Sequence, residues 1–234
     1  MRCFLPWAVV DMDERYSRNV PALTEEECAA LRQKRVCVVG CGGLGGFIIE
    51  FLSRVGIGYI RCVDGDVFDK TNLNRQILST VNTLGISKAQ AAKERIAAVN
   101  PDVEASAVCE FLTEDNARTI IENCDVVFDA LDNIDARRIL AKACESTEVP
   151  YIYGAIGGWV AQAAISMPGD GLIEMLYPPG TEIKNKSVLS FTPAFCASMQ
   201  AALGVKLLVG RKVETGKIYY FDLLNQEFET ISRV

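Results

Sequence analysis

Short apolar runs of strand length alternate with longer amphipathic segments along most of the chain. The run RVCVVG at 35–40 predicts a buried strand, and the segment 45–56 that follows predicts a helix with its apolar residues on one face. Strands that alternate with helices in this way indicate an α/β fold with a Rossmann-like, mostly parallel sheet flanked by helices. The same alternation predicts further strands at 59–66, 104–109, 125–131 and 150–156, and further helices at 88–100, 114–123 and 134–145.

The two ends of the chain depart from this alternation. Residues 1–34 predict a helical preface, in which Thr24 caps a helix at 24–33. Near the other end, segments 217–224 and 227–232 alternate apolar and polar residues and predict an antiparallel hairpin. The expected fold is therefore a mostly parallel α/β core with an N-terminal helical preface and a C-terminal antiparallel extension.

Three segments connect the expected core to the hairpin. A strand at 160–167 is followed by a crossing loop at 168–190 that is rich in proline and glycine. The next helix is expected at 192–209, with Thr192 as its cap and Pro193 at its first position.

Composition and charge narrow the classes of function. The net charge of −6, without a cluster of Lys and Arg, argues against a nucleic-acid partner. No apolar run has the length of a membrane span, and the segment FLPWAVV at 4–10 is expected to be a packing segment and not a signal peptide. Nine single cysteines without a C-x-x-C pair predict a reducing, cytoplasmic location and no zinc site. The chain has no histidine, so its chemistry must proceed without an imidazole base.

A glycine pattern after the first predicted strand indicates a phosphate-binding turn. The stretch VVGCGGLGG has the spacing G-x-G-x-x-G at Gly40, Gly42 and Gly45 and leads into a helix. Asp64, with Asp66 beside it, ends the second strand, where an acid takes the ribose hydroxyls of a bound nucleotide. These residues fit the pyrophosphate of NAD and the triphosphate of ATP equally well.

The residues that follow favour ATP. The segment NLNRQ at 72–76 places Asn72 and Arg75 at the carboxyl edge of the sheet, and Lys88 begins the next helix. Backbone amides largely satisfy one pyrophosphate, whereas a reacting triphosphate needs cations where charge accumulates. Asp132 is expected at the end of a buried strand, where it would hold Mg²⁺ through water.

The series GCGGLGG, DGD, NLNRQ, GISK, ENCDVVFDALDN and GAIGGWVAQ resembles the bacterial E1-like adenylyltransferases of the ThiF/MoeB/HesA type. That family includes enzymes of thiamine and molybdopterin biosynthesis and the core of ubiquitin-activating enzymes. The resemblance runs from about Arg15 to the final hairpin. It implies a single E1-like adenylation domain over 1–234. Its parts are an N-terminal helical segment at 1–34, a nucleotide-binding part at 35–153, and a carrier-binding sheet, crossing loop and hairpin at 154–234.

The resemblance implies ATP-dependent transfer of AMP to the C-terminal Gly-Gly carboxylate of a ThiS/MoaD-like, ubiquitin-like sulfur carrier, with release of pyrophosphate. The pathway would be thiamine, molybdopterin or related sulfur transfer. A C-terminal carboxylate is ionised at neutral pH, so the attack needs no general base. By motif, the nucleotide and Mg²⁺ would be bound by Gly40, Gly42, Gly43, Gly45, Asp64, Asp66, Asn72, Arg75, Lys88 and Asp132, with Asp132 as the residue that positions Mg²⁺. Catalysis would rest on Arg75, Lys88, Asp132 and Arg18, and neither Arg75 nor Lys88 is expected in the core.

Two further features follow from the resemblance. The segment RYSR at 15–18 matches a family segment whose arginine reaches into the partner subunit's active site, so Arg18 would act in trans within a homodimer. A charge on a helix surface is the alternative for Arg18. Some relatives form a thioester or persulfide on a cysteine; here Cys196 is the nearest candidate, although a core cysteine is the expected role.

Other functions stay open at this point. A non-catalytic E1-like scaffold would dock a carrier without turnover, but it predicts loss of Arg75, Lys88 and Asp132, which are all present. An NAD-dependent oxidoreductase is disfavoured by NLNRQ and by the absence of histidine. An enzyme that activates an RNA base is disfavoured by the acidic balance. The residues do not identify the carrier.

Overall fold

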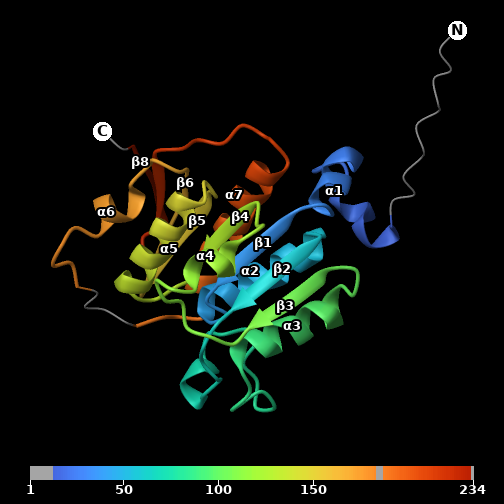
Figure 1. Ribbon diagram of the computed structural model, residues 1–234, viewed down its shortest axis with the longest axis horizontal. Helices are drawn as coiled ribbons and strands as arrows, with labels where there is room; N and C mark the ends of the chain where they lie inside the picture. The colour runs from blue at the N-terminus through green and yellow to red at the C-terminus, as the bar shows by residue number, and fades with distance from the viewer. Residues whose placement is uncertain (1–12, 183–186, 233–234) are drawn as a thin grey trace, which may run out of the picture.

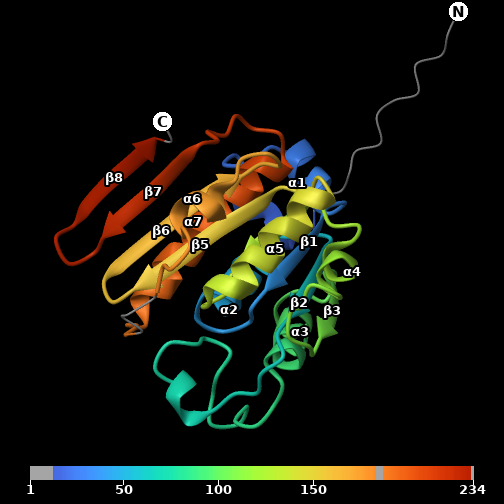
Figure 2. The same cartoon turned by 60° about the vertical axis from the view of Figure 1, so that its left-hand side comes forward.

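The computed structural model describes residues 13–182 and 187–232, and within them eight strands form one sheet. The strand order is β3-β2-β1-β4-β5-β6-β7-β8; the first five strands are parallel, and β6 to β8 add antiparallel pairs (Figures 1 and 2). The predicted mixed sheet, parallel in its core with an antiparallel extension, is confirmed. The strands are β1 Arg35–Val39, β2 Tyr59–Val63, β3 Glu104–Val108, β4 Val126–Asp129, β5 Tyr151–Gly157, β6 Val160–Ser166, β7 Lys217–Asp222 and β8 Glu227–Ser232.

Helices cover both faces of the sheet. On one face α2, α3 and α7 pack into a core with Val36 and Val38, while on the other face α4, α5 and α6 pack with Cys37 and Val39. Successive residues of β1 thus enter opposite cores, which is why this strand is apolar at nearly every position. The helices are α1 Glu25–Leu31, α2 Gly43–Val55, α3 Lys88–Val99, α4 Ala117–Ile121, α5 Ile134–Ser146, α6 Leu172–Leu176 and α7 Phe191–Leu208, and two 3₁₀ turns are η1 Glu14–Asn19 and η2 Lys70–Asn72.

The predicted caps were partly right. Thr24 caps α1 in a capping box with Glu27, as expected. Thr192, expected as the cap of α7, instead lies inside the helix and is fully buried, and its hydroxyl donates to the Gly158 carbonyl oxygen at 2.8 Å. The crossing loop also contains α6, which the Pro- and Gly-rich composition did not indicate. The packing role expected for 4–10 concerns residues outside the described part of the chain.

The expectation that no apolar run has the length of a membrane span was wrong: helix α7 has that length and hydropathy by composition alone, and half of that window is buried inside the protein. The core helix of a soluble protein passes the same test. α7 packs along α2, β5 and β6, and it lies behind the sheet in Figure 1. The apolar composition is therefore explained by packing on the sheet.

The 3₁₀ turn η1 lies at the edge of the sheet where the parallel strands begin. The Tyr16 ring covers Gly56, which ends α2, and the Tyr16 hydroxyl accepts a hydrogen bond from the buried Asn100 amide at 2.7 Å. α2 begins at Gly43, at the opposite edge, and its 13 residues span about 20 Å. The length of α2 thus separates η1, at one end of this helix, from the glycine turn at the other end.

Candidate active site

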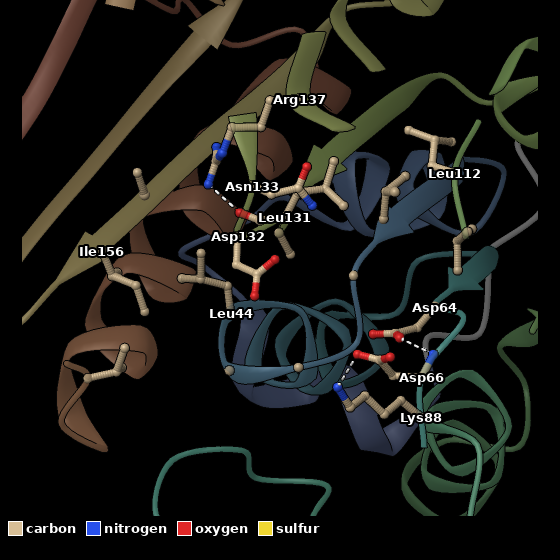
Figure 3. A pocket seen from close by; sticks show the side chains of 18 of the residues that line it. Leu44, Asp64, Asp66, Lys88, Leu112, Leu131, Asp132, Asn133, Arg137 and Ile156 are labelled. Carbon is tan, nitrogen blue, oxygen red and sulfur yellow. Dashed lines mark hydrogen bonds and ion pairs between the residues drawn. The ribbon is translucent and has the colours of Figure 1, made fainter. Parts of the chain in front are cut away.

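A cavity of about 630 Å³ opens at the carboxyl ends of the parallel strands (Figure 3). The chain runs from β1 to β2 on one side and later to β4 on the other, so the cavity lies at the point where the strand order reverses. Ligands bind open α/β sheets at this position. The walls come from the glycine turn, the end of β2 and the segment up to the start of α3, the loops after β3 and β4, strand β5 and the start of β6.

Two glycines of the turn, Gly40 and Gly45, pack so closely that they leave no room for a side chain. Gly40 has a φ of +95°, and a Cβ there would lie 2.5 Å from the Ala130 carbonyl oxygen. A Cβ on Gly45 would lie 1.7 Å from the Gly40 carbonyl oxygen. Gly40, Gly42 and Gly43 line the cavity, whereas Gly45 does not: it lets α2 pack against the turn.

Helix α2 presents its N-terminus to the cavity. It begins at Gly43, and no side chain caps it. The first N–H groups of a helix lack intrahelical partners and carry the positive end of the helix dipole. An uncapped N-terminus on a cavity is an anion-binding site, and a phosphate is the anion expected after a glycine turn.

Two carboxylates follow β2 at the cavity wall. Asp64 accepts hydrogen bonds from the Cys41 and Asp66 backbone N–H groups, both at 2.8 Å, so it ties the end of β2 to the glycine turn. Burial raises the pKa of Asp64, and these two hydrogen bonds oppose that rise. Asp66 forms an ion pair with Lys88 Nζ at 2.9 Å. The expected acid at the end of the second strand is therefore present and faces the cavity (Figure 3).

Lys88 is the first residue of α3 and also lines the cavity. Its side chain is only 10% exposed, so the expectation that Lys88 lies outside the core was wrong. The helix start is set by Ser87, whose hydroxyl accepts from the Gln90 N–H. This placement brings the ammonium group to the cavity while the stem of the side chain is buried.

Arg75 and Asn72 lie differently although they belong to one motif. The Arg75 guanidinium donates to the Thr71 carbonyl at 2.8 Å and to Asn74 Oδ1 at 2.9 Å, and it lines the cavity. Asn72 is buried outside the cavity lining, where its Oδ1 accepts from the Asp69 N–H and closes the capping box of η2. Arg75 thus lines the cavity together with other predicted residues, whereas Asn72 supports the turn that precedes Arg75.

Gln76 lines the cavity, although the family resemblance predicted no role for it. Its side chain lies over Gly42, so that a Cβ built on Gly42 would lie 3.4 Å from Gln76 Nε2. Its buried Oε1 has no hydrogen-bond partner among the described residues. The only sequence signal for Gln76 was its place at the end of NLNRQ.

Asp132 follows β4 in the loop before α5 and faces the cavity (Figure 3). The expectation that Asp132 ends the strand was wrong, because β4 ends three residues earlier at Asp129. No described residue pairs with the exposed Asp132 carboxylate. The described residues also contain no group of three or more His, Cys, Asp and Glu that could hold a metal by themselves. A free single carboxylate beside a phosphate site fits Mg²⁺ that is shared with phosphates.

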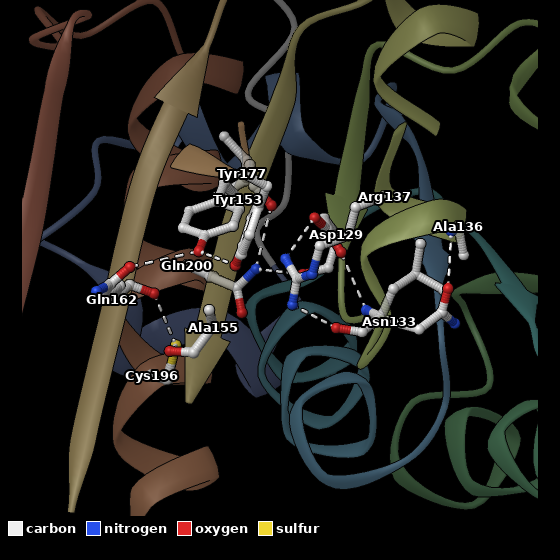
Figure 4. A network of polar contacts seen from close by, with 12 residues as sticks. Asp129, Asn133, Ala136, Arg137, Tyr153, Ala155, Gln162, Tyr177, Cys196 and Gln200 are labelled. Carbon is white, nitrogen blue, oxygen red and sulfur yellow. Dashed lines mark hydrogen bonds and ion pairs between the residues drawn. The ribbon is translucent and has the colours of Figure 1, made fainter. Parts of the chain in front are cut away.

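A buried ion pair beside this loop was missed by sequence reasoning. Asp129 is fully buried and binds Arg137 of α5, with 2.7 Å between Oδ2 and Nη1 (Figure 4). Burial raises the pKa of Asp129, although the Arg137 charge opposes this, and the carboxylate in turn keeps the pKa of Arg137 above its usual value. The sequence offered only an Asp at a strand end and an Arg eight residues later, which is not a distinctive signal.

The far end of the cavity reaches the antiparallel part of the sheet. Gly157 lines it, and a Cβ on this glycine would meet nothing within 4 Å. The hydroxyls of Tyr153 and Tyr177 lie 2.7 Å apart, and Tyr153 also reaches Gln162 (Figure 4). Apart from Arg137, the residues that line this end carry no charge, and Tyr177 brings the crossing loop to its wall.

Arg18 lies outside the cavity lining. It is exposed on η1, at the opposite edge of the sheet from the glycine turn. The structure therefore does not bring Arg18 together with the cavity residues of its own chain.

Cys196 is not placed as a reactive thiol. It is 1% exposed in α7, and its Sγ lies 3.2 Å from the Gln162 carbonyl oxygen. Burial raises its pKa to about 12. Since the thiolate is the nucleophilic form, the geometry favours the core role for Cys196.

The ThiF family model matches residues 16–233 of the chain. The SAMP-activating enzyme E1 of Haloferax volcanii is 32% identical, and the match covers 93% of this chain and 84% of that relative. The sulfur carrier protein adenylyltransferase of Thermus thermophilus is 31% identical, with 97% of this chain and 89% of the relative covered. The probable molybdopterin-synthase adenylyltransferase of Porphyra purpurea is 34% identical, and the chain spans 59% of its length.

Solved structures share the fold. The structure of E. coli MccB with ATP superposes with a TM-score of 0.80 at 20% sequence identity. The superposition covers 94% of this chain and 72% of the MccB chain. At this identity the likeness concerns the arrangement of the strands and helices alone.

The packing of Gly45 predicts a large effect of a single methyl group. Gly45→Ala places a Cβ against the Gly40 carbonyl oxygen, so the turn must move, and we expect a loss of about 3 kcal/mol of unfolding free energy. Gly157→Ala, where a Cβ meets open space, is the matched control and should cost less than about 0.5 kcal/mol. Urea unfolding measures both variants. Equal stability of Gly45→Ala and the unchanged chain would contradict the assigned packing.

The burial of Cys196 predicts its reactivity. In the native protein, iodoacetamide should label the exposed Cys109 and leave Cys196 unmodified until the chain is unfolded. Peptide mapping by mass spectrometry after timed quenching measures the two sites separately. Labelling of native Cys196 at the rate of Cys109 would show an accessible thiol and reopen a covalent role.

Proposed function

The chain belongs to the ThiF family, and we propose that it is an E1-like adenylyltransferase that activates the C-terminal Gly-Gly carboxylate of a ubiquitin-like sulfur carrier. It would transfer AMP from ATP to that carboxylate and release pyrophosphate. The observation that supports this most strongly is one continuous cavity with two different ends. One end carries the glycine turn and charged residues, and the other is open and lined by Gly157.

The charged end suits ATP. The free N-terminus of α2 provides N–H donors for phosphate, and Asp64 has lone pairs left for the ribose hydroxyls. Arg75 and Lys88 supply the two cations that a triphosphate needs beyond backbone amides. Asp132 is the residue that would hold Mg²⁺ together with the phosphates, and the ion would neutralise charge on the leaving pyrophosphate.

The open end suits an extended peptide tail. A chain that ends in Gly-Gly can lie close to the backbone of Gly157, because neither side has a side chain there. The carboxylate oxygen of the tail forms a bond to the α-phosphorus, and the bond from that phosphorus to the bridging oxygen of pyrophosphate breaks. The pKa of a C-terminal carboxyl is about 3.5, so the nucleophile is already ionised and the absence of histidine is no obstacle.

The names of the relatives support the class of partner. They include an enzyme that activates SAMP, an adenylyltransferase of a sulfur carrier protein and a probable adenylyltransferase of molybdopterin synthase. For this chain we infer a ubiquitin-like sulfur carrier of the ThiS/MoaD type as the partner, and a cytoplasmic site of action. A non-catalytic scaffold is less well supported, because Arg75, Lys88 and Asp132 all line the cavity.

Exchange of labelled pyrophosphate into ATP tests the reaction and its residues. We expect exchange only when a Gly-Gly carrier is added, and Arg75→Ala should lower it by about 100-fold or more because a cation at the developing charge is lost. Arg118→Ala, an exposed arginine on α4 outside the cavity lining, is the control and should retain the rate. Near-normal exchange by Arg75→Ala, with melting temperatures matched, would contradict the site assignment.

The position of Arg18 predicts complementation between subunits of a homodimer. Arg18 lies at the far edge of its own subunit, so only a second copy could bring it to the cavity. An equal mixture of Arg18→Ala and Arg75→Ala chains should regain about a quarter of the activity of the unchanged protein. Half of randomly formed dimers would contain both variants, and each of these would carry one intact site out of two. Subunit exchange is verified with differently tagged chains. If exchange is complete and activity is not regained, Arg18 does not act in trans.

A further inference from the structure

The Asp129–Arg137 ion pair is placed where stability alone does not explain it. Asp129 is fully buried and Arg137 is 3% exposed, so both charges have lost their water. A buried pair contributes little net stability, because the loss of hydration offsets the attraction between the charges. The pair, drawn in Figure 4, is hydrogen-bonded to Leu131, the residue before Asp132, which indicates a role in the geometry of that loop.

The ion pair holds the loop of Asp132 through the backbone N–H and carbonyl groups of Leu131. Asp129 Oδ1 accepts from the Leu131 N–H at 3.0 Å, and Arg137 Nη2 donates to the Leu131 carbonyl oxygen. Farther along, Asn133 Oδ1 accepts from the Ala136 N–H at 2.8 Å and begins α5. Asp132 is thus fixed on both sides, although no described residue forms a hydrogen bond or ion pair with its carboxylate.

The same guanidinium meets the opposite wall of the cavity. Its carbon lies 5.1 Å from the centre of the Tyr153 ring and 6.0 Å from that of Tyr177. Tyr177 belongs to the crossing loop, and the neighbouring Arg138 donates to its carbonyl oxygen at 3.0 Å. Two adjacent arginines of α5 therefore join the crossing loop to the loop after β4.

We propose that Arg137 is a positioning residue: through Leu131 it sets the Asp132 carboxylate for a divalent cation on ATP, and through Tyr153 and Tyr177 it keeps that loop in register with the crossing loop. This inference rests on the proposed function for the identity of the nucleotide. Arg137 acts through Asp132, because one Nη group is bonded to Asp129 and the other to the Leu131 carbonyl.

Arg137→Lys is the direct test. The lysine keeps a positive charge opposite Asp129 but lacks the second arm that reaches the Leu131 carbonyl. Arg95→Lys is the matched control, because Arg95 also pairs with a buried carboxylate, that of Glu50, and lies outside the cavity lining. The double variant Asp129→Asn/Arg137→Met leaves no unpaired buried charge and keeps the test valid if the single variant folds poorly.

Two readouts do not depend on turnover. Hydrogen exchange of the Leu131 amide should become about tenfold faster in Arg137→Lys and stay unchanged in Arg95→Lys. The gain in ATP affinity when Mg²⁺ is added, measured by calorimetry, should fall by about tenfold in Arg137→Lys and in the double variant, and Asp132→Asn should show the same loss. ATP affinity without Mg²⁺ should stay within about threefold of the unchanged chain.

The outcomes separate the inference from the proposed function. If the unchanged chain gains affinity with Mg²⁺ and Arg137→Lys keeps that gain and the slow Leu131 exchange, the positioning role is overturned while the function stands. If the unchanged chain does not bind ATP at all, the proposed function fails, and the inference fails with it. Equal effects of Arg137→Lys and Arg95→Lys would show that the pair serves stability alone.

Discussion

The cavity depends on close packing between three backbone segments that only glycine permits. The Gly45 backbone lies against the Gly40 carbonyl oxygen, and Gly40 in turn lies against the Ala130 carbonyl oxygen. These contacts bring the start of α2 and the loop after β4 into one wall. The uncapped helix N-terminus and Asp132 can face the same ligand because Gly40 and Gly45 have no side chains to hold these segments apart.

The charges around this turn are arranged for a polyanion and not for proton transfer. Lys88 is held by Asp66, Arg75 is held by the Thr71 carbonyl, and Asp132 has no partner among the described residues. Preorganised cations and N–H donors stabilise charge that develops on phosphate without reorganisation at the moment of reaction. The reaction proposed here needs this stabilisation and no base, which is consistent with a chain that contains no histidine.

The parallel core of the sheet and the cavity edge could be predicted because they follow from local signals. Alternating strands and helices imply a parallel sheet, and the carboxyl ends of its strands bring Gly40, Asp64 and Lys88 to one edge. The burial of Lys88 and the fully buried Asp129–Arg137 pair could not be predicted, because both depend on packing between distant segments. Thr192 was assigned as a cap from its residue type, yet its bond to the Gly158 carbonyl becomes visible only in the folded chain.

The proposed reaction requires that the two ends of the cavity hold ATP and the tail of a carrier at the same time. Native mass spectrometry of the chain with ATP, Mg²⁺ and a panel of Gly-Gly carriers tests this directly. We expect a complex in which one carrier has gained one AMP, and no such adduct with a carrier whose last glycine is deleted. A carrier that binds beside intact ATP and never gains AMP would rule out the proposed transfer.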